Sequence, residues 1–142
     1  MAHEVLKNCY VAINGTDLTS HVTSVTLDYS ADMVEDTTFG QGTHGMRAGL
    51  LNWSISLEMN GEGGAATVEG VLWPLVGDDT GFTVVIRRIN GDAVSASNPE
   101  YQGVGVLESF SPLSGAIGEL WTTSPTIQPH ASSPTLVRDV TP

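Results

Sequence analysis

The chain has 142 residues, of which 40% are hydrophobic and 15% are charged. A chain of this length falls within the usual size of one domain and can bury roughly two-thirds of the surface that it exposes when unfolded. Sixteen acidic residues face only five basic ones, so the formal net charge is −11. Affinity for nucleic acid comes largely from clustered Lys and Arg. The composition therefore predicts a folded, acidic domain that does not bind DNA or RNA specifically.

The ends and the cysteine content bear on where the protein works. The single cysteine, Cys9, cannot form an internal disulfide, and its apolar neighbours favour a small buried side chain. Residues 1–7 contain no apolar signal segment, and no run of about 18 apolar residues occurs in the chain. We therefore expect synthesis in the cytoplasm and no membrane association.

The first predicted elements are strands, which are indicated by apolar periodicity and turn residues. Residues 8–13 form an apolar run that ends at Asn14-Gly15, a dipeptide that tolerates the positive φ of tight hairpins. Residues 23–29 carry apolar side chains at alternate positions. Residues 51–59 alternate strictly, with apolar side chains at odd positions and polar ones at even positions. Asn-Gly also follows at 60/61 and 90/91, which predicts two further turns.

A short helix and three more strands are predicted in the second half of the chain. Apolar residues at 68, 71, 72 and 75 share one helical face, and Pro74 is expected to end the helix near Trp73. Residues 82–89, 101–110 and 119–128 are the remaining predicted strands. The whole pattern predicts a mainly β protein, with a single sandwich or barrel domain over residues 1–142 and one short flanking helix.

Two stretches do not follow the core pattern. Residues 31–49 form a predicted loop that is longer than most loops in compact domains, and its apolar side chains need a surface to pack on, in their own domain or in a neighbouring subunit. The residues that we expect to make this contact are Met33, Val34, Phe39, Met46 and Arg47. Residues 129–142 hold three prolines and one apolar pair, Leu136 and Val137, so an extended C-terminal arm is expected.

No motif predicts catalysis or a cofactor. Residues 40–45 match G-x-G-x-x-G, but the preceding strand and following helix of a dinucleotide site are missing from the pattern. The four histidines are dispersed, without the spacing of a zinc site. No nucleophile motif accompanies the Ser, His and Asp residues. We therefore expect a protein that is not an enzyme and that uses no cofactor or metal.

The order of the elements resembles that of the major tail tube proteins of long-tailed bacteriophages. The resemblance lies in residues 11–18, 22–29, 46–55 and 104–113, and it covers most of the chain. It implies a β-sandwich or barrel with one helix, six copies that close into a ring, and rings that stack into a tube for genome passage. The predicted 31–49 loop would reach the adjacent ring.

The resemblance also gives the acidity a function. Acids on the polar faces of strands would line the channel, where a negative wall lets DNA pass without being held. The candidates are Asp28, Glu58 and Glu108. The implied partners are further copies of the chain and the tail tip, tape measure and terminator proteins of a virion.

Other functions stay open from sequence alone. A head decoration protein or another virion accessory protein would share the β-rich composition and the arms but bind a capsid lattice. A tube of a contractile or secretion machine would be a close structural relative. A free-standing β-sandwich module could bind glycans through Trp53, Trp73 or Trp121, although the first lies on an apolar strand face and the second in the predicted helix.

Overall fold

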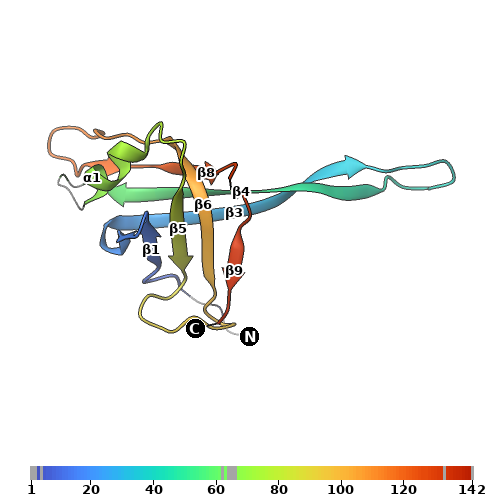
Figure 1. The fold of residues 1–142 in the computed structure, drawn as a ribbon, viewed down its shortest axis with the longest axis horizontal. Helices are drawn as coiled ribbons and strands as arrows, with labels where there is room; N and C mark the ends of the chain where they lie inside the picture. Colours follow the sequence, from blue (N-terminus) through green and yellow to red (C-terminus); the bar gives the residue numbers. More distant parts are fainter. Residues whose placement is uncertain (1–2, 4, 62, 64–66, 133, 142) are drawn as a thin grey trace.

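The structure, a computed structural model, describes residues 3, 5–61, 63, 67–132 and 134–141. One sheet contains all the described strands and curls into a half-barrel, with a short helix packed against it (Figure 1). The strands are β1 (Tyr10–Ile13), β2 (Thr16–Asp17), β3 (Val22–Glu35), β4 (Met46–Asn60), β5 (Phe82–Arg87), β6 (Glu100–Ser109), β7 (Thr122–Thr123), β8 (Thr126–Pro129) and β9 (Val137–Asp139). The helical segments are η1 (Thr19–His21), α1 (Val68–Leu72) and η2 (Trp73–Leu75). The predicted mainly β fold is confirmed.

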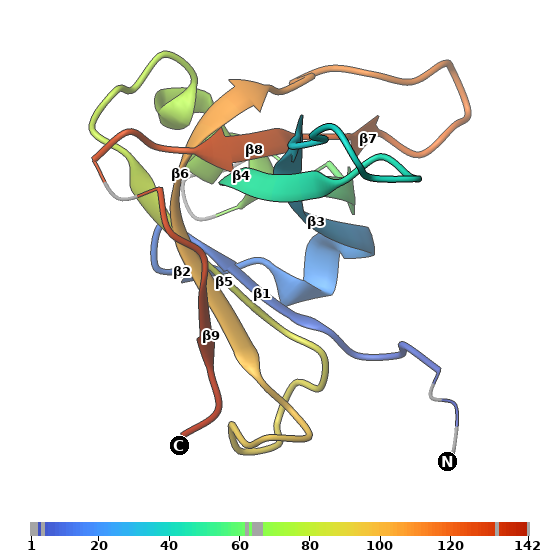
Figure 2. The same cartoon turned by 90° about the vertical axis from the view of Figure 1, so that its right-hand side faces the viewer.

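The strands lie in the order β2-β1-β5-β6-β8-β4-β3, and all these pairings are antiparallel. Viewed along its long axis, the sheet curls from β4 and β8 over β6 to β5 and β1 (Figure 2). Two short strands lie off this path, since β7 pairs with β4 and β9 pairs with β6. In the described chain β3 therefore has a neighbour on one side only.

The hydrophobic core fills the inner face of the curled sheet. The alternation predicted for residues 51–59 is confirmed from Trp53 onwards in β4, where the side chains at 53, 55, 57 and 59 are buried, whereas Leu51 is 64% exposed. They pack with apolar side chains of β1, β5 and β8, among them Ile13, Val84 and Ile127. Full burial of each such side chain contributes about 1.5–3 kcal/mol relative to exposure. The inner face of the sheet is therefore the source of most of its stability.

The predicted helix is confirmed, and so is its predicted end near Trp73. α1 closes one side of the core through Val68 and Leu72, both without exposed surface. Pro74 cannot donate the next helical hydrogen bond, so the chain continues as the single turn η2, which places Leu75 in the core as well.

The predicted loop over residues 31–49 needs correction, because nearly half of it is strand. β3 and β4 stay paired through Met33 opposite Ala48 and Glu35 opposite Met46, which leaves residues 36–45 as the loop. The pairing is irregular between Ala31 and Met33, which disturbs the alternation of side chains. Neither face is covered by the core here, so no buried face imposes an apolar alternation that the sequence could show.

The expected C-terminal arm also needs correction, because it lies on its own domain. Residues 137–139 pair with β6 as strand β9, beyond the end of β8. The buried indole of Trp53 donates a hydrogen bond of 2.8 Å to the carbonyl oxygen of Pro134, and Leu136 is packed against the core. Val137 stays about half exposed. The segment is extended, as predicted, but it completes the sheet instead of projecting from it.

Of the three predicted Asn-Gly turns, the structure confirms those at Asn14-Gly15 and Asn90-Gly91. Asn14 and Gly15 both have positive φ, and they join β1 to β2. Asn60-Gly61 leads towards α1 and not into a partner strand. Asn90-Gly91 lies in a longer connection over residues 88–99, where the buried Asn98 side chain bonds the main chain of Ile89 in both directions. The side-chain amide of Asn98, and not a two-residue hairpin turn, therefore organises the connection.

Two glycines of β6 let this strand pass close to the core side chains. A Cβ on Gly105 would lie 2.5 Å from Cγ2 of Ile127, and a Cβ on Gly103 would lie 2.7 Å from Cζ2 of Trp53. Both distances are far below van der Waals contact. The indole of Trp53 and the side chain of Ile127 therefore require glycine on the facing strand.

We expect Gly105→Ala to lower the free energy of unfolding by about 1–3 kcal/mol, because the added methyl group overpacks the core. Guanidinium unfolding of the unassembled chain measures the change. Gly63→Ala is the control, since a Cβ there meets no atom within 4 Å. Equal stability of the two variants would contradict the close packing of β6.

Candidate assembly interface

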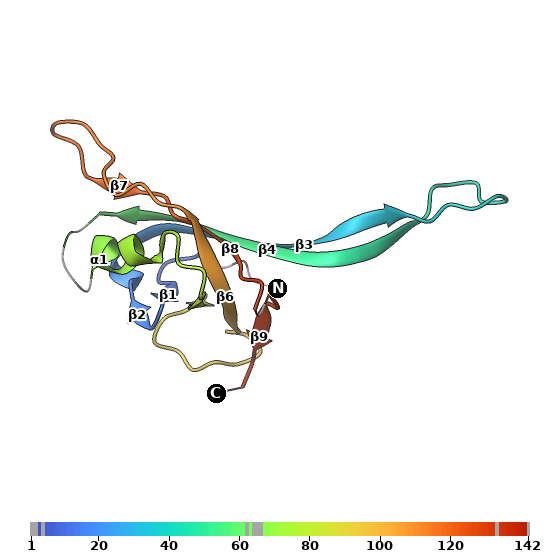
Figure 3. The same cartoon turned by 45° about the horizontal axis from the view of Figure 1, so that its top comes forward.

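The most prominent surface feature is an arm formed by β3 and β4. The two strands leave the half-barrel together and project far beyond it as a hairpin (Figure 3). We use "the arm" for residues 29–52, where β4 pairs with β3 alone. A two-stranded ribbon is marginally stable by itself in water. The arm therefore depends on its own local contacts and on whatever covers it in an assembly.

Local polar contacts shape the tip of the arm, residues 36–45. The amide of Asp36 donates to the Gly45 carbonyl at 2.8 Å, and the Gly45 amide donates to Oγ1 of Thr37 at 2.9 Å. The guanidinium of Arg47 forms an ion pair with the Asp36 carboxylate. Exposed pairs of this kind contribute about 1 kcal/mol or less. Arg47 therefore fixes the base of the tip and has its charge neutralised there.

The apolar residues predicted to make a contact all lie on the arm and are exposed. Met33, Val34 and Met46 are each more than half exposed, and Phe39 at the tip is fully exposed. Leu50 and Leu51 are exposed as well, although Leu51 was predicted from its alternation to face the core. At these residues β4 extends beyond the part of the sheet that encloses the core. So many exposed apolar side chains on a narrow ribbon mark an interaction surface.

The three candidate channel acids share one face of the sheet. Asp28, Glu58 and Glu108 are exposed. Each follows a leucine that packs in or against the core: Leu27, Leu57 and Leu107. Since successive side chains of a strand point to opposite faces, Asp28 and Glu58 point away from the core. Glu108 lies at an irregularity in the pairing of β6 with β8, and it accepts a hydrogen bond of 3.4 Å from Gln128, the outward-facing neighbour of the buried Ile127. The structure thus brings together on one surface residues that are 80 positions apart in sequence.

This outer face is polar as well as acidic. Its β3 positions are Ser24, Thr26, Asp28 and Ser30, which lie opposite the β4 positions Glu58, Ser56, Ser54 and Asn52. The row continues sideways from Ser56 to Thr126 of β8, and Gln128 donates a hydrogen bond to Glu108 of β6. No basic or apolar side chain occurs at these ten positions or at Glu108. We call this surface the acidic face.

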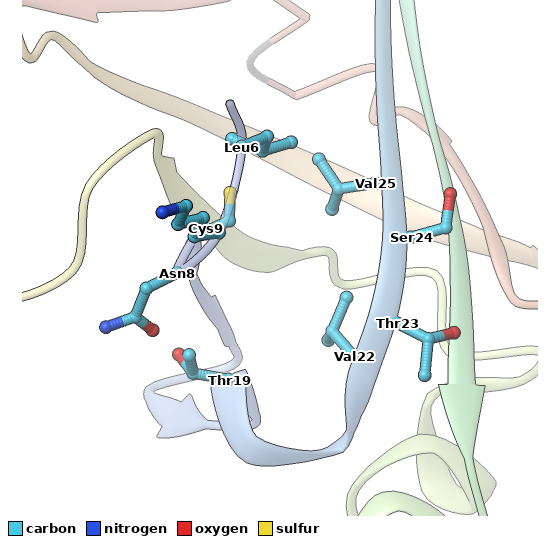
Figure 4. Close-up of a pocket in the computed structure, with 9 residues that line it drawn as sticks. Leu6, Asn8, Cys9, Thr19, Val22, Thr23, Ser24 and Val25 are labelled. Carbon is cyan, nitrogen blue, oxygen red and sulfur yellow. The ribbon is translucent and has the colours of Figure 1, made fainter. Parts of the chain in front are cut away.

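The half-barrel is open along the outer edge of β3. Val22 and Val25 point from β3 towards Leu6 and Cys9 of the N-terminal segment, while Thr23 and Ser24 lie on the other side of the strand (Figure 4). A cavity of about 110 Å³ lies between the two segments. In the part of the chain that the structure describes, β4 is the only strand that pairs with β3. A long strand with one free edge is a site for pairing with another chain.

Sequence reasoning missed a second protrusion. Residues 119–121, predicted to begin a strand, belong to a loop over residues 110–121 that exposes Leu113, Ile117 and Leu120. The apolar pair Leu120 and Trp121 imitates the start of a strand, but pairing begins only at Thr122. The signal that was available is the absence of charge from residues 109–118.

Comparison with solved structures shows chains of the same shape. A chain of the extended-state sheath/tube terminator of PVC, an extracellular contractile injection system, aligns with a TM-score of 0.72, 14% identity and 98% of each chain covered. The SPP1 tail tube aligns with a TM-score of 0.68 and 10% identity over 94% of this chain and 77% of that one. The chain has the tail tube fold. No family model matches the sequence, and no curated protein is similar to it by sequence.

A third structure with this fold comes from a gene transfer agent. A chain from the tail of its empty particle, refined with C6 symmetry, aligns with a TM-score of 0.65, 15% identity, and 92% and 93% of the two chains covered. The fold expected from the family resemblance is therefore confirmed. At such identities the likeness is one of backbone path, so residue roles in this tail tube fold rest on its own geometry.

One cluster of polar side chains in this tail tube fold needs a separate account. His130 is buried, and its Nδ1 lies 2.6 Å from Oγ of Ser132 and accepts the Ser132 amide at 3.0 Å. Its Nε2 lies 2.6 Å from the main-chain oxygen of Asp79, whereas the Asp79 carboxylate lies 3.6 Å away. Nδ1 is therefore the acceptor and Nε2 carries the proton. The imidazole joins the end of β8 to the loop before β5, which is a structural role.

Among the described residues, no three His, Cys, Asp or Glu side chains come together as metal ligands would. Within the same part of the chain, no helix has the length and apolar character that crossing a membrane requires.

The alkylation rate of Cys9 reports on the packing beside the outer edge of β3. Its thiol donates to the carbonyl oxygen of Arg87 at 2.9 Å, and burial raises the pKa of the thiol above its ordinary value. A raised pKa leaves less thiolate at any given pH below it, so we expect alkylation by iodoacetamide at pH 8 to be slower than for an unfolded chain. The same reaction in guanidinium is the control. Equal rates in the folded and unfolded chains would contradict the described environment of Cys9.

Proposed function

We propose that this chain is a structural subunit of a tail tube, in which copies close into rings and rings stack into a tube with an acidic channel. The observation that carries the proposal is the acidic face, an uncharged-to-negative polar surface on the same strands that form the arm. β3 and β4 thus offer both a wall and a projecting connector. This arrangement supports a structural role.

Lateral contact between copies would use the free edge of β3. Among the described residues no strand pairs with its outer edge, and closure of a ring removes such edges without leaving an open end. The number six is supported by the resemblance to tail tube proteins and by the C6 symmetry of the gene transfer agent tail. The small cavity beside Val22 and Val25 would then lie at or near the contact between neighbours.

Stacking of rings would use the arm. Met33, Val34, Phe39 and Met46 provide apolar surface, while Arg47 holds the tip in shape through Asp36. Burial of this surface against the next ring would also stabilise a ribbon that is marginal alone. The C-terminal residues Leu136 and Val137 would support the subunit's own sheet and not a neighbour, because β9 pairs with β6 of the same chain.

The acidic face would line the channel. In each subunit this face carries the carboxylates of Asp28, Glu58 and Glu108 and no basic residue, so a ring of copies presents a negative wall. At physiological ionic strength the Debye length is about 8 Å, and repulsion therefore acts on phosphates that come near the wall. Hydroxyl and amide side chains between the acids keep the wall hydrated. DNA would pass without specific binding.

In this proposal the protein is a virion component that is made in the host cytoplasm. Its partners are further copies of itself and the tail tip, tape measure and terminator proteins. The likeness to a chain of the PVC terminator makes a tube of a contractile injection system the second candidate. The glycan-binding alternative is less well supported, since Trp53 is buried and the ring of Trp121 packs on Gly61, which leaves Trp73 as the one largely exposed tryptophan.

Negative-stain microscopy at rising protein concentration, with size-exclusion chromatography alongside, tests the proposed function. We expect rings and tubes of uniform diameter. A protein that stays monomeric at every concentration, also when a tail tip complex is added as initiator, would contradict the proposal.

The arm can be shortened at its outer end without a change in the register of β3 and β4. Since Val34 lies opposite Arg47, replacing residues 34–47 by Asn-Gly joins Met33 to Ala48 through a two-residue turn. We expect this variant to keep the far-UV circular dichroism and the melting temperature of the domain but to form no stacks, because the core lies outside the arm. Loss of folding would show that the arm is part of the core, and normal tubes would show that stacking uses another surface.

The acidic face can be tested by charge reversal. We expect tubes of Glu58→Lys to assemble but to retain double-stranded DNA after nuclease treatment, because a lysine in the wall attracts phosphates. The matched control is Asp92→Lys, an equal change of charge at an exposed residue in the 88–99 connection. DNA retention by the control alone, or by neither variant, would place Glu58 outside the channel.

A further inference from the structure

The loop of residues 110–121 and the arm lie at opposite ends of the molecule. Both Figure 1 and Figure 3 place the arm at one end of the long axis and the 110–121 loop at the other, beside α1. The loop exposes Leu113, Ile117 and Leu120, and the last two are 106% and 67% exposed. Neither the core nor the acidic face explains these side chains.

The loop is a folded structure that presents its apolar side chains outward. The amide of Thr122 donates to Ser114 at 3.2 Å, and that of Glu119 donates to Ala116 at 3.0 Å. At its base, Gly61 donates to the Trp121 carbonyl at 2.7 Å, and the Trp121 ring lies so close that a Cβ on Gly61 would meet it at 2.3 Å. With its base held in this way, the loop does not fold its apolar side chains onto the domain.

The outermost residues at both ends carry no charged side chain. Residues 37–43 of the arm and residues 109–118 of the loop contain no Asp, Glu, Lys or Arg. Two copies that each carry −11 repel one another wherever acidic surfaces meet. The two tips are therefore places where copies can touch through apolar groups without that repulsion.

The surface available is on the scale of a specific contact. A stable interface buries about 800 Å² on each partner. One aromatic side chain such as Phe39 supplies roughly 150–250 Å², and the arm carries five further exposed apolar side chains besides Tyr29. Because the two surfaces lie at opposite ends, a contact between them is heterologous, and repetition of it builds an open stack.

We propose that the 110–121 loop is the receiving surface for the arm tip of a second copy in the next ring. This inference rests on the proposed tube function and names the contact that would hold its layers together. Phe39 and its neighbours in one copy pack on Leu113, Ile117 and Leu120 of the other. The occupant is a copy of this chain, because the same molecule carries both uncharged apolar tips.

Two single variants break the two sides of this contact separately. Phe39→Asp inactivates the arm tip and leaves the loop intact, whereas Ile117→Asp inactivates the loop and leaves the arm intact. We expect each variant alone to form single rings and no tubes in negative stain. Ile117→Ser removes the apolar group without adding charge, and circular dichroism shows whether each variant is folded.

Mixing the two variants gives the decisive result. The intact arm of Ile117→Asp rings can enter the intact loop of Phe39→Asp rings once, so preformed rings mixed in equal amounts should give two-ring stacks and nothing longer. Tubes of normal length from either single variant would overturn the inference, and so would a mixture that stays as single rings.

Two controls separate this inference from the proposed function. Val5→Asp adds the same charge to an exposed apolar residue of the N-terminal segment, and it should form tubes of normal length. If the unaltered protein forms no rings or tubes, the proposed function fails and the inference fails with it. If the unaltered protein forms tubes and Ile117→Asp does so equally, only the inference fails.

Discussion

The long antiparallel pairing of β3 with β4 is the constraint on which the rest of the structure depends. At one end the two strands lie over the core, and Trp53, Ile55 and Leu57 are buried beneath them. At the other end the same pairing continues past the last core side chain and becomes an exposed ribbon. One continuous hydrogen-bonded ladder therefore joins a stable domain to an element that is marginal without a partner. Assembly is the natural way to cover that element.

The same two strands also separate two chemistries. Because side chains alternate across a strand, the leucines that pack with the core force their neighbours Asp28 and Glu58 onto the opposite face. That face carries hydroxyl, amide and carboxylate groups, and the cross-strand rows extend it over β8 to β6. A sheet with an apolar inner face and an acidic outer face can form a stable subunit and a non-binding wall at once. Charge and fold are linked through this alternation.

The sequence was informative where one face of a strand is buried. Residues 53–59 alternate because their odd positions meet the core, and from this parity the outward direction of Glu58 could be predicted. Leu51 continues the pattern in sequence but lies beyond the core. Residues 46–50 show no such pattern, since both faces of the arm are exposed and the pairing is irregular beside Ala31. The connection over residues 88–99 is held by the side-chain amide of Asn98, nine residues from Ile89. The C-terminal segment is held by a hydrogen bond from the indole of Trp53. Local sequence patterns do not reveal either contact. The 110–121 loop was missed because exposed apolar residues imitate a strand.

The central claim is that the acidic face lines the channel of a tube that these subunits form. A cryo-electron microscopy map of the assembled protein, at a resolution that places side chains, tests it most directly. The account predicts that Asp28, Glu58 and Glu108 point into the lumen and that the arm of each subunit contacts the next ring. A map with these three carboxylates on the outer surface of the tube would contradict it.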